Sequence, residues 1–412
     1  MHVVHKRFQH GVGQGSFHSA KIKVTAAGKQ DYRFDYVYDC GAVAHIDKTA
    51  LRQRIDSLRL RPRAYSTNKG VINALVLSHF DQDHIVGAKH LIRQYNVGRI
   101  FLPYLSPQEW MLVLASQADR WRAVQIRALH ALATGATDQF FGVPATMVDP
   151  TGDQDNDGGP PADQPSPSGD EPVSAEGRKV STPSFPRDLQ AVVGPKGAAL
   201  GLRLPPGADV TLRLPGSPSP KIAWLLRFWN RGVSHALLHR LEQNLATCGF
   251  PLAGLNKPSG VHAVLNWLDL KSRRDQTLDA YLDAVNATQP AGAGLLSSKH
   301  IANYISMGLY SGPAGTFIPF TASYGVGQWR ETAGGNYFWS GYSASRTLPH
   351  SGSQDRPGWL GTGDAPLGEL GVWTDFARRY RRQLDQAITV QVPHHEQHQK
   401  AERSSSTPAC CR

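Results

Sequence analysis

The sequence has few cysteines and no long apolar segment, and both absences exclude classes of protein. Its 412 residues include four cysteines, which form no Cys-x-x-Cys pair. This usage favours a reducing, cytoplasmic setting over a disulfide framework. No apolar run approaches the roughly 20 residues that a membrane-spanning helix needs, and the N-terminal segment MHVVHKRFQHGVGQG lacks the apolar core of a signal peptide. We therefore expect a cytoplasmic protein that does not insert into a membrane.

Acidic residues are also scarce relative to basic ones. Lys and Arg number 44 against 33 Asp and Glu, which gives a formal net charge of +11 at pH 7. Seven acidic residues and no basic residue lie between Asp153 and Glu176, so without that segment the chain carries +18. A basic body favours an anionic partner such as nucleic acid or a phosphorylated small molecule. A basic protein that binds neither explains the charge equally well.

Hydrophobic patterning divides the chain into five regions and predicts an α/β fold. The first region alternates predicted strands and helices, which is typical of layered α/β folds. The second is rich in Pro, Gly, Ser and Asp and is expected to be a disordered acidic insert. The third begins with strand-like segments and continues as a mostly helical insertion, the fourth returns to strands, and the last is expected to be a disordered tail. The regions are residues 1–148, 149–190, 191–298, 299–398 and 399–412.

Local signals place several elements in the first region. Residues 71–78 (VINALVLS) form the near-continuous apolar run of a strand buried on both faces. Residues 84–95 have helical spacing. Ser106, Pro107 and Glu109 form a capping box with proline at the first helical position, which predicts a helix that extends toward Ala133.

The segment that carries the most chemical information is SHFDQDHIVG, residues 78–87, between the predicted strand and the predicted helix. It places His79, Asp81, Asp83 and His84 within six residues. Imidazole and carboxylate groups are ligands that Zn²⁺ and Mn²⁺ accept. Alternate residues of an extended loop point to one side, so the first three can converge and His84 can join them as the helix begins. The alternative is a polar loop whose side chains only cap the helix.

This HxDxDH string resembles the second motif of the metallo-β-lactamase superfamily. Further segments, in the same order as in that superfamily, resemble its branch represented by the C-terminal domain of the competence protein ComEC. They are GVGQG at 11–15, YDCG at 38–41, NYISMGLY at 303–310, WLGTGDA at 359–365 and ITVQVPHH at 388–395. The resemblance covers about residues 8–105 and 299–398, and the region between them is then an enlarged connection.

The resemblance implies an αββα metallo-β-lactamase sandwich, in which two mixed sheets lie between helices and the metals lie at the strand ends. It implies two divalent metal ions, Zn²⁺ or Mn²⁺. It also implies catalytic roles for Asp83, for Asp364 as the carboxylate that bridges the ions, and for Asp39 as the residue that orients the ligand loop. Asn303 and Ser306 are expected to contact substrate. The implied metal ligands are His79, Asp81, Asp83, His84, Asp364 and His394.

The sequence departs from the superfamily pattern in three places. Asp81 stands where a histidine is commoner, and a carboxylate there shifts the preference from Zn²⁺ toward Mn²⁺ or Mg²⁺. The element that usually reads PHHGS lacks its Gly and Ser, so either His394 or His395 binds metal, and the position directly after the strand favours His394. No histidine stands out as the third-motif ligand. His300 is the nearest candidate by its order in the sequence, although a solvent-exposed histidine is the better interpretation of this residue.

These features together predict a metal-dependent phosphodiesterase or nuclease that cuts DNA through a metal-activated hydroxide. Arg378 and Arg379 directly precede Tyr380 in an arginine-rich segment and are expected to contact substrate phosphates, with a solvated helix face as the alternative. Two other functions stay open. The first is hydrolysis of a small ester, lactone or phosphorylated metabolite. The second is a catalytically degenerate domain that binds nucleic acid or protein.

Overall fold

A computed structural model provides the structure of the chain. It describes part of the chain. The acidic insert beyond Pro150, the tail, His300, His394 and His395 lie outside the described residues. The described residues are 2–25, 32–43, 45–58, 62–63, 67–118, 126–127, 130–131, 142–150, 202–204, 207, 209–213, 223–252, 258–288, 303–313, 321–331, 337–347, 358–368, 370–384 and 387–391.

The larger of two main sheets has eight strands and is mixed. Its first three strands are antiparallel, whereas β3, β5, β6, β7 and β8 run parallel to one another, and β4 pairs with β5 at one end. The strands are β1 (His2–Gln9), β2 (Phe17–Thr25), β3 (Tyr32–Cys40), β4 (Pro62–Arg63), β5 (Thr67–Val76), β6 (Asn96–Pro103), β7 (Ala145–Val148) and β8 (Leu202–Leu204). The apolar run predicted as a buried strand is β5, which lies between β3 and β6.

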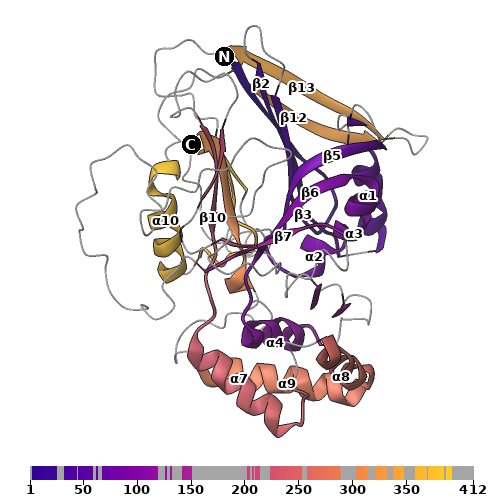
Figure 1. Ribbon diagram of the computed structural model, residues 1–412, viewed down its shortest axis with the longest axis vertical. Helices are drawn as coiled ribbons and strands as arrows, with labels where there is room; N and C mark the ends of the chain where they lie inside the picture. The colour runs from indigo at the N-terminus through magenta and orange to yellow at the C-terminus, as the bar shows by residue number, and fades with distance from the viewer. Residues whose placement is uncertain are drawn as a thin grey trace, which may run out of the picture.

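A five-stranded sheet in the order β15-β14-β11-β10-β9 faces the larger sheet (Figure 1). Its strands are β9 (Asp209–Arg213), β10 (Ala223–Trp229), β11 (Gly308–Pro313), β14 (Gly358–Gly361) and β15 (Ala387–Gln391). Only β14 and β15 are parallel within it. A separate hairpin of β12 (Thr321–Glu331) and β13 (Tyr337–Thr347) lies beside β1.

Apolar side chains fill three layers of core. The inner layer lies between the two sheets and includes the fully buried Tyr36, Trp224 and Trp359. The outer face of the large sheet packs on α1 (His45–Asp56), α3 (Ala88–Gln94) and the helices beyond them, and the outer face of the small sheet packs on α10 (Leu370–Leu384). Sheets of mixed direction covered by helices confirm the predicted α/β class.

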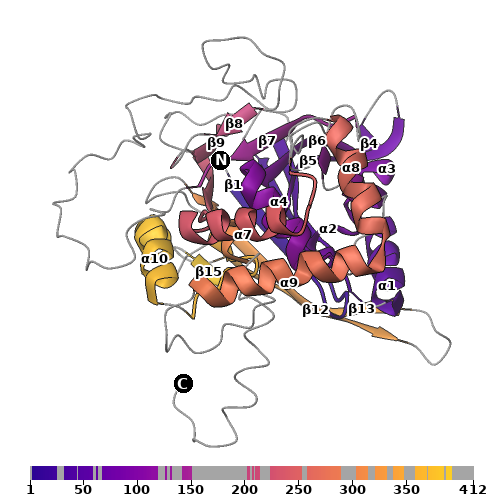
Figure 2. The same cartoon turned by 90° about the horizontal axis from the view of Figure 1, so that it is seen from below.

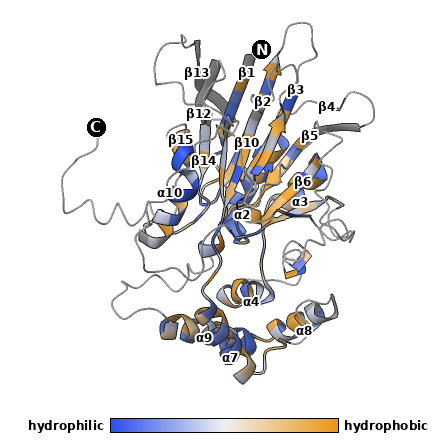
Figure 3. Cartoon of the chain, turned by 60° about the vertical axis from the view of Figure 1, so that its left-hand side comes forward, coloured by the Kyte–Doolittle hydropathy of each residue, from blue (hydrophilic) through white to orange (hydrophobic). Residues whose placement is uncertain are grey.

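A helical layer lies beyond one end of the large sheet. It consists of α7 (His235–Thr247), α8 (Pro258–Asp269) and α9 (Lys271–Thr288), and α4 (Pro107–Ser116) packs against α7 and α9 (Figure 2). On α7, Leu237, Leu241 and Leu245 recur every four residues and are buried, and Ser234 accepts a hydrogen bond from the Leu237 amide at the N-terminus. Figure 3 shows both hydrophilic and hydrophobic residues on α7, as expected of a helix at a surface.

Two local predictions need correction. The segment predicted as one helix over 84–95 is split into α2 (Gln82–Ile85) and α3, because the Gly87 amide donates to the carbonyl of Cys40 on β3 instead of continuing the turn. Helix α4 begins at the predicted capping box but ends at Ser116, short of Ala133. Residues 303–305 form a helical turn, and β11 begins only at Gly308. Among the described residues, no helix combines the length and apolarity needed to cross a membrane.

Candidate metal centre

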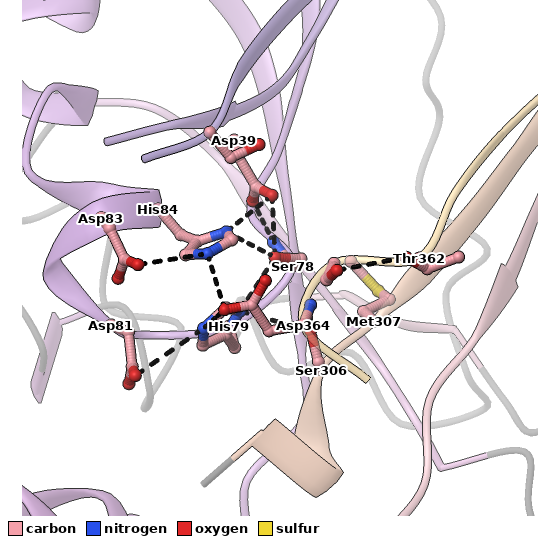
Figure 4. A network of polar contacts seen from close by, with 12 residues as sticks. Asp39, Ser78, His79, Asp81, Asp83, His84, Ser306, Met307, Thr362 and Asp364 are labelled. Atoms are coloured by element: carbon pink, nitrogen blue, oxygen red, sulfur yellow. Dashed lines mark hydrogen bonds and ion pairs between the residues drawn. The ribbon is translucent and has the colours of Figure 1, made fainter. Parts of the chain in front are cut away.

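The predicted ligands come together where strands from both sheets end. His79, Asp81, Asp83 and His84 follow β5 of the large sheet, and Asp364 follows β14 of the small sheet (Figure 4). The two sheets are joined here directly, because the Met307 amide donates to the Ser78 carbonyl at 2.7 Å.

Four of these residues form a buried group, which we call the ligand cluster: His79, Asp83, His84 and Asp364. Within the described part of the chain, His79, Asp83 and His84 are the set of three whose donor atoms all lie within 4.8 Å of one another. Asp364 Oδ2 lies 3.2 Å from His84 Nε2 and 3.9 Å from His79 Nε2. Two imidazoles and two carboxylates in so small a volume form a donor set that fits Zn²⁺ or Mn²⁺.

Hydrogen bonds fix the orientation of both imidazoles. His84 Nδ1 lies 2.8 Å from Asp39 Oδ2, and His79 Nδ1 lies 3.0 Å from Ser78 Oγ and 3.2 Å from Ser306 Oγ. Because a proton on Nδ1 serves these contacts, the Nε2 atoms are the ones turned toward Asp364. Histidines that bind metals are commonly oriented in this way by a carboxylate or hydroxyl on the other ring nitrogen.

Asp39 organises the loop that carries the two histidines. Its Oδ1 accepts from the Ser78 amide at 2.7 Å and its Oδ2 accepts from Ser78 Oγ at 2.9 Å, in addition to the contact with His84. Asp39 has a φ of +57°, in the left-handed region that non-glycine residues rarely adopt. Such strain persists where surrounding contacts over-determine the conformation, and here they direct the carboxylate into the loop.

Gly41 is required by the close approach of the same loop. A Cβ at this position would lie 2.0 Å from the Asp83 carbonyl carbon and 2.1 Å from the His84 nitrogen. The Ser16 amide donates to the Asp83 carbonyl at 2.9 Å, so the glycine-containing segment at 11–15 leads directly into a contact with the loop. The YDCG segment and Ser16, the residue after GVGQG, thus both contact the HxDxDH segment in space.

Ser306 supports the ligands from the small-sheet side. Its Oγ accepts from the Asp364 amide at 2.8 Å and contacts His79 Nδ1, and the residue is fully buried. Gly363, which precedes Asp364, has a φ of +56° and lies against Ser306 and Ser78. Asn303 is also buried. The structure thus places Ser306 behind the ligands, whereas the sequence predicted a contact with substrate.

Asp81 lies beside the ligand cluster but is not a member of it. Its Oδ2 lies 3.9 Å from His79 Nε2, and its Oδ1 accepts a hydrogen bond from Gln117 Nε2. Burial, and then the neighbouring Asp83, raise the pKa of Asp81 to about 7. Burial opposes the charged form of His84, but the carboxylates of Asp364 and Asp39 outweigh it and raise the pKa of His84 well above its usual value. The centre is therefore an electronegative site that favours a cation.

The arginine-rich segment lies on α10, and the structure separates its members. Arg379 donates to Asp209 Oδ1 at 2.7 Å and to the Phe228 carbonyl, and Tyr380 is fully buried, so neither presents itself to a substrate. The expected substrate contact therefore needs correction at Arg379. Arg378 is 58% exposed and pairs with Asp375 at 2.6 Å.

Two residues of the site, Ser78 and Gln117, were not identified from the sequence. Ser78 had a signal, since it lies between a buried strand and His79. Ser306 was identified, but as a substrate contact, and its supporting role follows only from its neighbours in space. Gln117 had no local signal, because it lies far along the chain from Asp81 and follows an apolar helix.

Comparison of the chain with models of known families, with curated proteins and with solved structures gave no match.

Proposed function

We propose that this protein is a metal-dependent hydrolase of the metallo-β-lactamase type that cleaves phosphodiester bonds in nucleic acid. The observation that carries the proposal is the buried ligand cluster at the ends of strands from both sheets. The αββα arrangement is supported by the cores on both faces of both sheets, and by the contacts of Asp39 in YDCG and Asp364 in TGD with His84 in the HxDxDH segment.

The residues of the cluster have separate tasks in this proposal. His79, Asp83, His84 and Asp364 would hold the metal, which would supply Lewis acidity for activation of water and of a phosphoryl oxygen. Asp39 keeps the proton of His84 on Nδ1, so that Nε2 is the donor to the metal. Asp81 lies next to this group. A second ion needs further donors such as Asp81 and His394.

Charge supports nucleic acid as the substrate. The chain carries +11 overall, and α10, which follows Asp364 closely in sequence, presents exposed Arg378, Arg381 and Arg382. Trp373 on the same helix is 44% exposed. Arginine side chains contact phosphates and an exposed aromatic ring can stack on a base, so this surface fits single-stranded nucleic acid.

The test is metal content by mass spectrometry on protein purified without chelator. Cleavage of linear and single-stranded DNA in Mn²⁺, Mg²⁺ and Zn²⁺ is measured alongside. We expect bound metal and cleavage that the double variant Asp83→Ala, His84→Ala loses while it keeps its circular dichroism spectrum.

Each other outcome changes the functional assignment. Cleavage retained by the folded double variant overturns the site. Bound metal without DNA cleavage moves the assignment to a small ester, lactone or phosphorylated metabolite, which a panel of nitrophenyl esters and phosphodiesters would identify. Neither metal nor cleavage would leave a binding domain without catalysis.

A further inference from the structure

Asp81 occupies the N-cap position of α2 without using its side chain as a cap. An aspartate there ordinarily accepts a hydrogen bond from an amide in the first turn of the helix. Asp81 has the extended backbone of an N-cap residue, but its carboxylate makes no such bond. Its Oδ1 instead accepts a hydrogen bond from Gln117 Nε2. Its Oδ2 lies on the side of His79, 3.9 Å from Nε2 (Figure 4). The carboxylate therefore joins two parts of the molecule.

Gln117 reaches this carboxylate from the end of α4, where it is the C-cap residue. It is 6% exposed, so its amide lies inside the protein, whereas the Asp81 side chain is 20% exposed. Leaving a buried amide donor without a partner costs free energy, so the hydrogen bond to Asp81 is retained. The contact consequently holds the Asp81 carboxylate in place.

Helix α4 packs against the helical layer and gives Gln117 a fixed position. At its N-terminus, Glu109 closes the capping box with Ser106, and its other carboxylate oxygen accepts from the Val233 amide just before α7. The helix packs against α7 and α9, and its residues from Glu109 to Ala115 are buried. Movement of α4 would therefore move the Gln117 amide that donates a hydrogen bond to Asp81.

We infer that Gln117 is a positioning residue that holds Asp81 Oδ2 toward the ligand cluster, so that the helical layer sets the affinity of the centre for a divalent ion. The inference rests on the proposed function. It links the helical layer to the metal centre through α4. Neighbours that orient the groups around a metal typically change its affinity by about 10–100-fold when they are replaced.

The experiment measures the Mn²⁺ dissociation constant of the full chain by isothermal titration calorimetry, with thermal unfolding as the check on folding. The variant Gln117→Met keeps the length of the side chain and removes the donor, and we expect it to bind Mn²⁺ about tenfold more weakly. The matched control is Gln383→Met. Gln383, on α10, is also 6% exposed and accepts a hydrogen bond from Arg227 at 2.8 Å. Both variants therefore lose a buried glutamine.

A double-mutant cycle with Asp81→Ala separates action through Asp81 from a general structural effect. If Gln117 acts through Asp81, Gln117→Met has no further effect on Mn²⁺ affinity in that background. Gln117→Asn, whose amide is too short to reach, serves as a second variant if Gln117→Met does not fold.

Equal Mn²⁺ affinity of a folded Gln117 variant and the unsubstituted chain overturns the inference and leaves the proposed function intact. The inference is also overturned if Gln383→Met weakens binding as much, or if the effect of Gln117→Met persists without Asp81. If the unsubstituted chain does not bind Mn²⁺, the inference for this ion is overturned, and the proposed function fails as well if the chain also binds neither Zn²⁺ nor Mg²⁺.

Discussion

Two pairs of buried histidines show how surroundings decide what an imidazole can do. His79 and His84 lie with ring centroids 3.9 Å apart among carboxylates, and the pKa of His84 is raised well above its usual value. His5 and His18 lie between the sheets among aromatic rings. His18 stacks on Trp359 at 4.2 Å, and burial lowers the pKa of His18 well below its usual value.

The difference shows that burial alone does not make a metal site. Both pairs are shielded from water, but only the first has negative charge around it to favour a cation. The second pair has Arg7 nearby and is held by Gln9 and Tyr36, so it acts as a packing element. The following variants are ordered from the largest expected effect to the smallest.

The largest effect is expected from Asp364→Asn, which removes charge from the ligand cluster without changing its shape. Asp364 Oδ2 is the carboxylate oxygen nearest to His84 Nε2, at 3.2 Å. We expect Mn²⁺ affinity to fall by more than about 100-fold, beyond the range seen when only supporting groups are replaced. Isothermal titration calorimetry checks this. His18→Gln is the control and should leave the Mn²⁺ affinity unchanged. An equal loss of Mn²⁺ affinity in both variants would show that the two histidine pairs do not differ in their role in cation binding.

Asp39→Asn tests the support of His84 and is expected to weaken Mn²⁺ binding by about 10–100-fold. An amide at this position can present its NH₂ group to His84 Nδ1, which would favour the tautomer with its proton on Nε2. The change is measured by calorimetry and by DNA cleavage. Mn²⁺ affinity equal to that of the unsubstituted chain would show that Asp39 serves the fold alone.

The stability of the second pair is expected to depend on pH. The folded pKa of His18 lies well below the unfolded value of 6.5, because burial, and then Arg7, His10 and His5, disfavour its charged form. The unfolded chain therefore binds the proton first, and stability from this group is present above pH 6.5 and lost as the pH falls below it. The loss approaches about 1.4 kcal/mol for each pH unit.

Urea unfolding between pH 7 and pH 5, on metal-free protein, measures this slope. His18→Gln should reduce it, since glutamine does not titrate. The raised pKa of His84 has the opposite sign, so its contribution is fully present below pH 6.5 and is lost only as the pH rises. An unchanged slope in His18→Gln would mean that other groups cause the acid sensitivity.

The smallest effect is expected from Arg378→Gln, which lies outside both pairs. Its side chain is 58% exposed, so its contribution is at most about 1 kcal/mol. Affinity for single-stranded DNA should fall severalfold and the slope of log affinity against log salt should decrease by about 0.7, with Mn²⁺ affinity unchanged. Fluorescence anisotropy at several salt concentrations measures both. An unchanged salt slope would remove α10 from the proposed substrate surface.

The sequence by itself determined strand β5, the start of α4 and the grouping of four candidate metal ligands on one loop. Strand β5, the capping box of α4 and the HxDxDH segment depend on neighbours within a few residues, so local patterns reveal them. Helix ends were harder to predict, since the break after α2 comes from a hydrogen bond to β3 that no local pattern contains.

Only the tertiary structure decided that Ser306 and Gln117 support the candidate ligands, whereas the orienting role of Asp39 was already implied by the resemblance. Ser306 and Gln117 lie in different parts of the chain, and their roles follow from contacts across long sequence intervals. The same holds for the arginines of α10. Arg378 and Arg379 are adjacent and chemically identical, but the turn of the helix directs one to solvent and the other to Asp209. Charge and ligand type can be seen in a sequence, whereas burial and partners are properties of the folded chain.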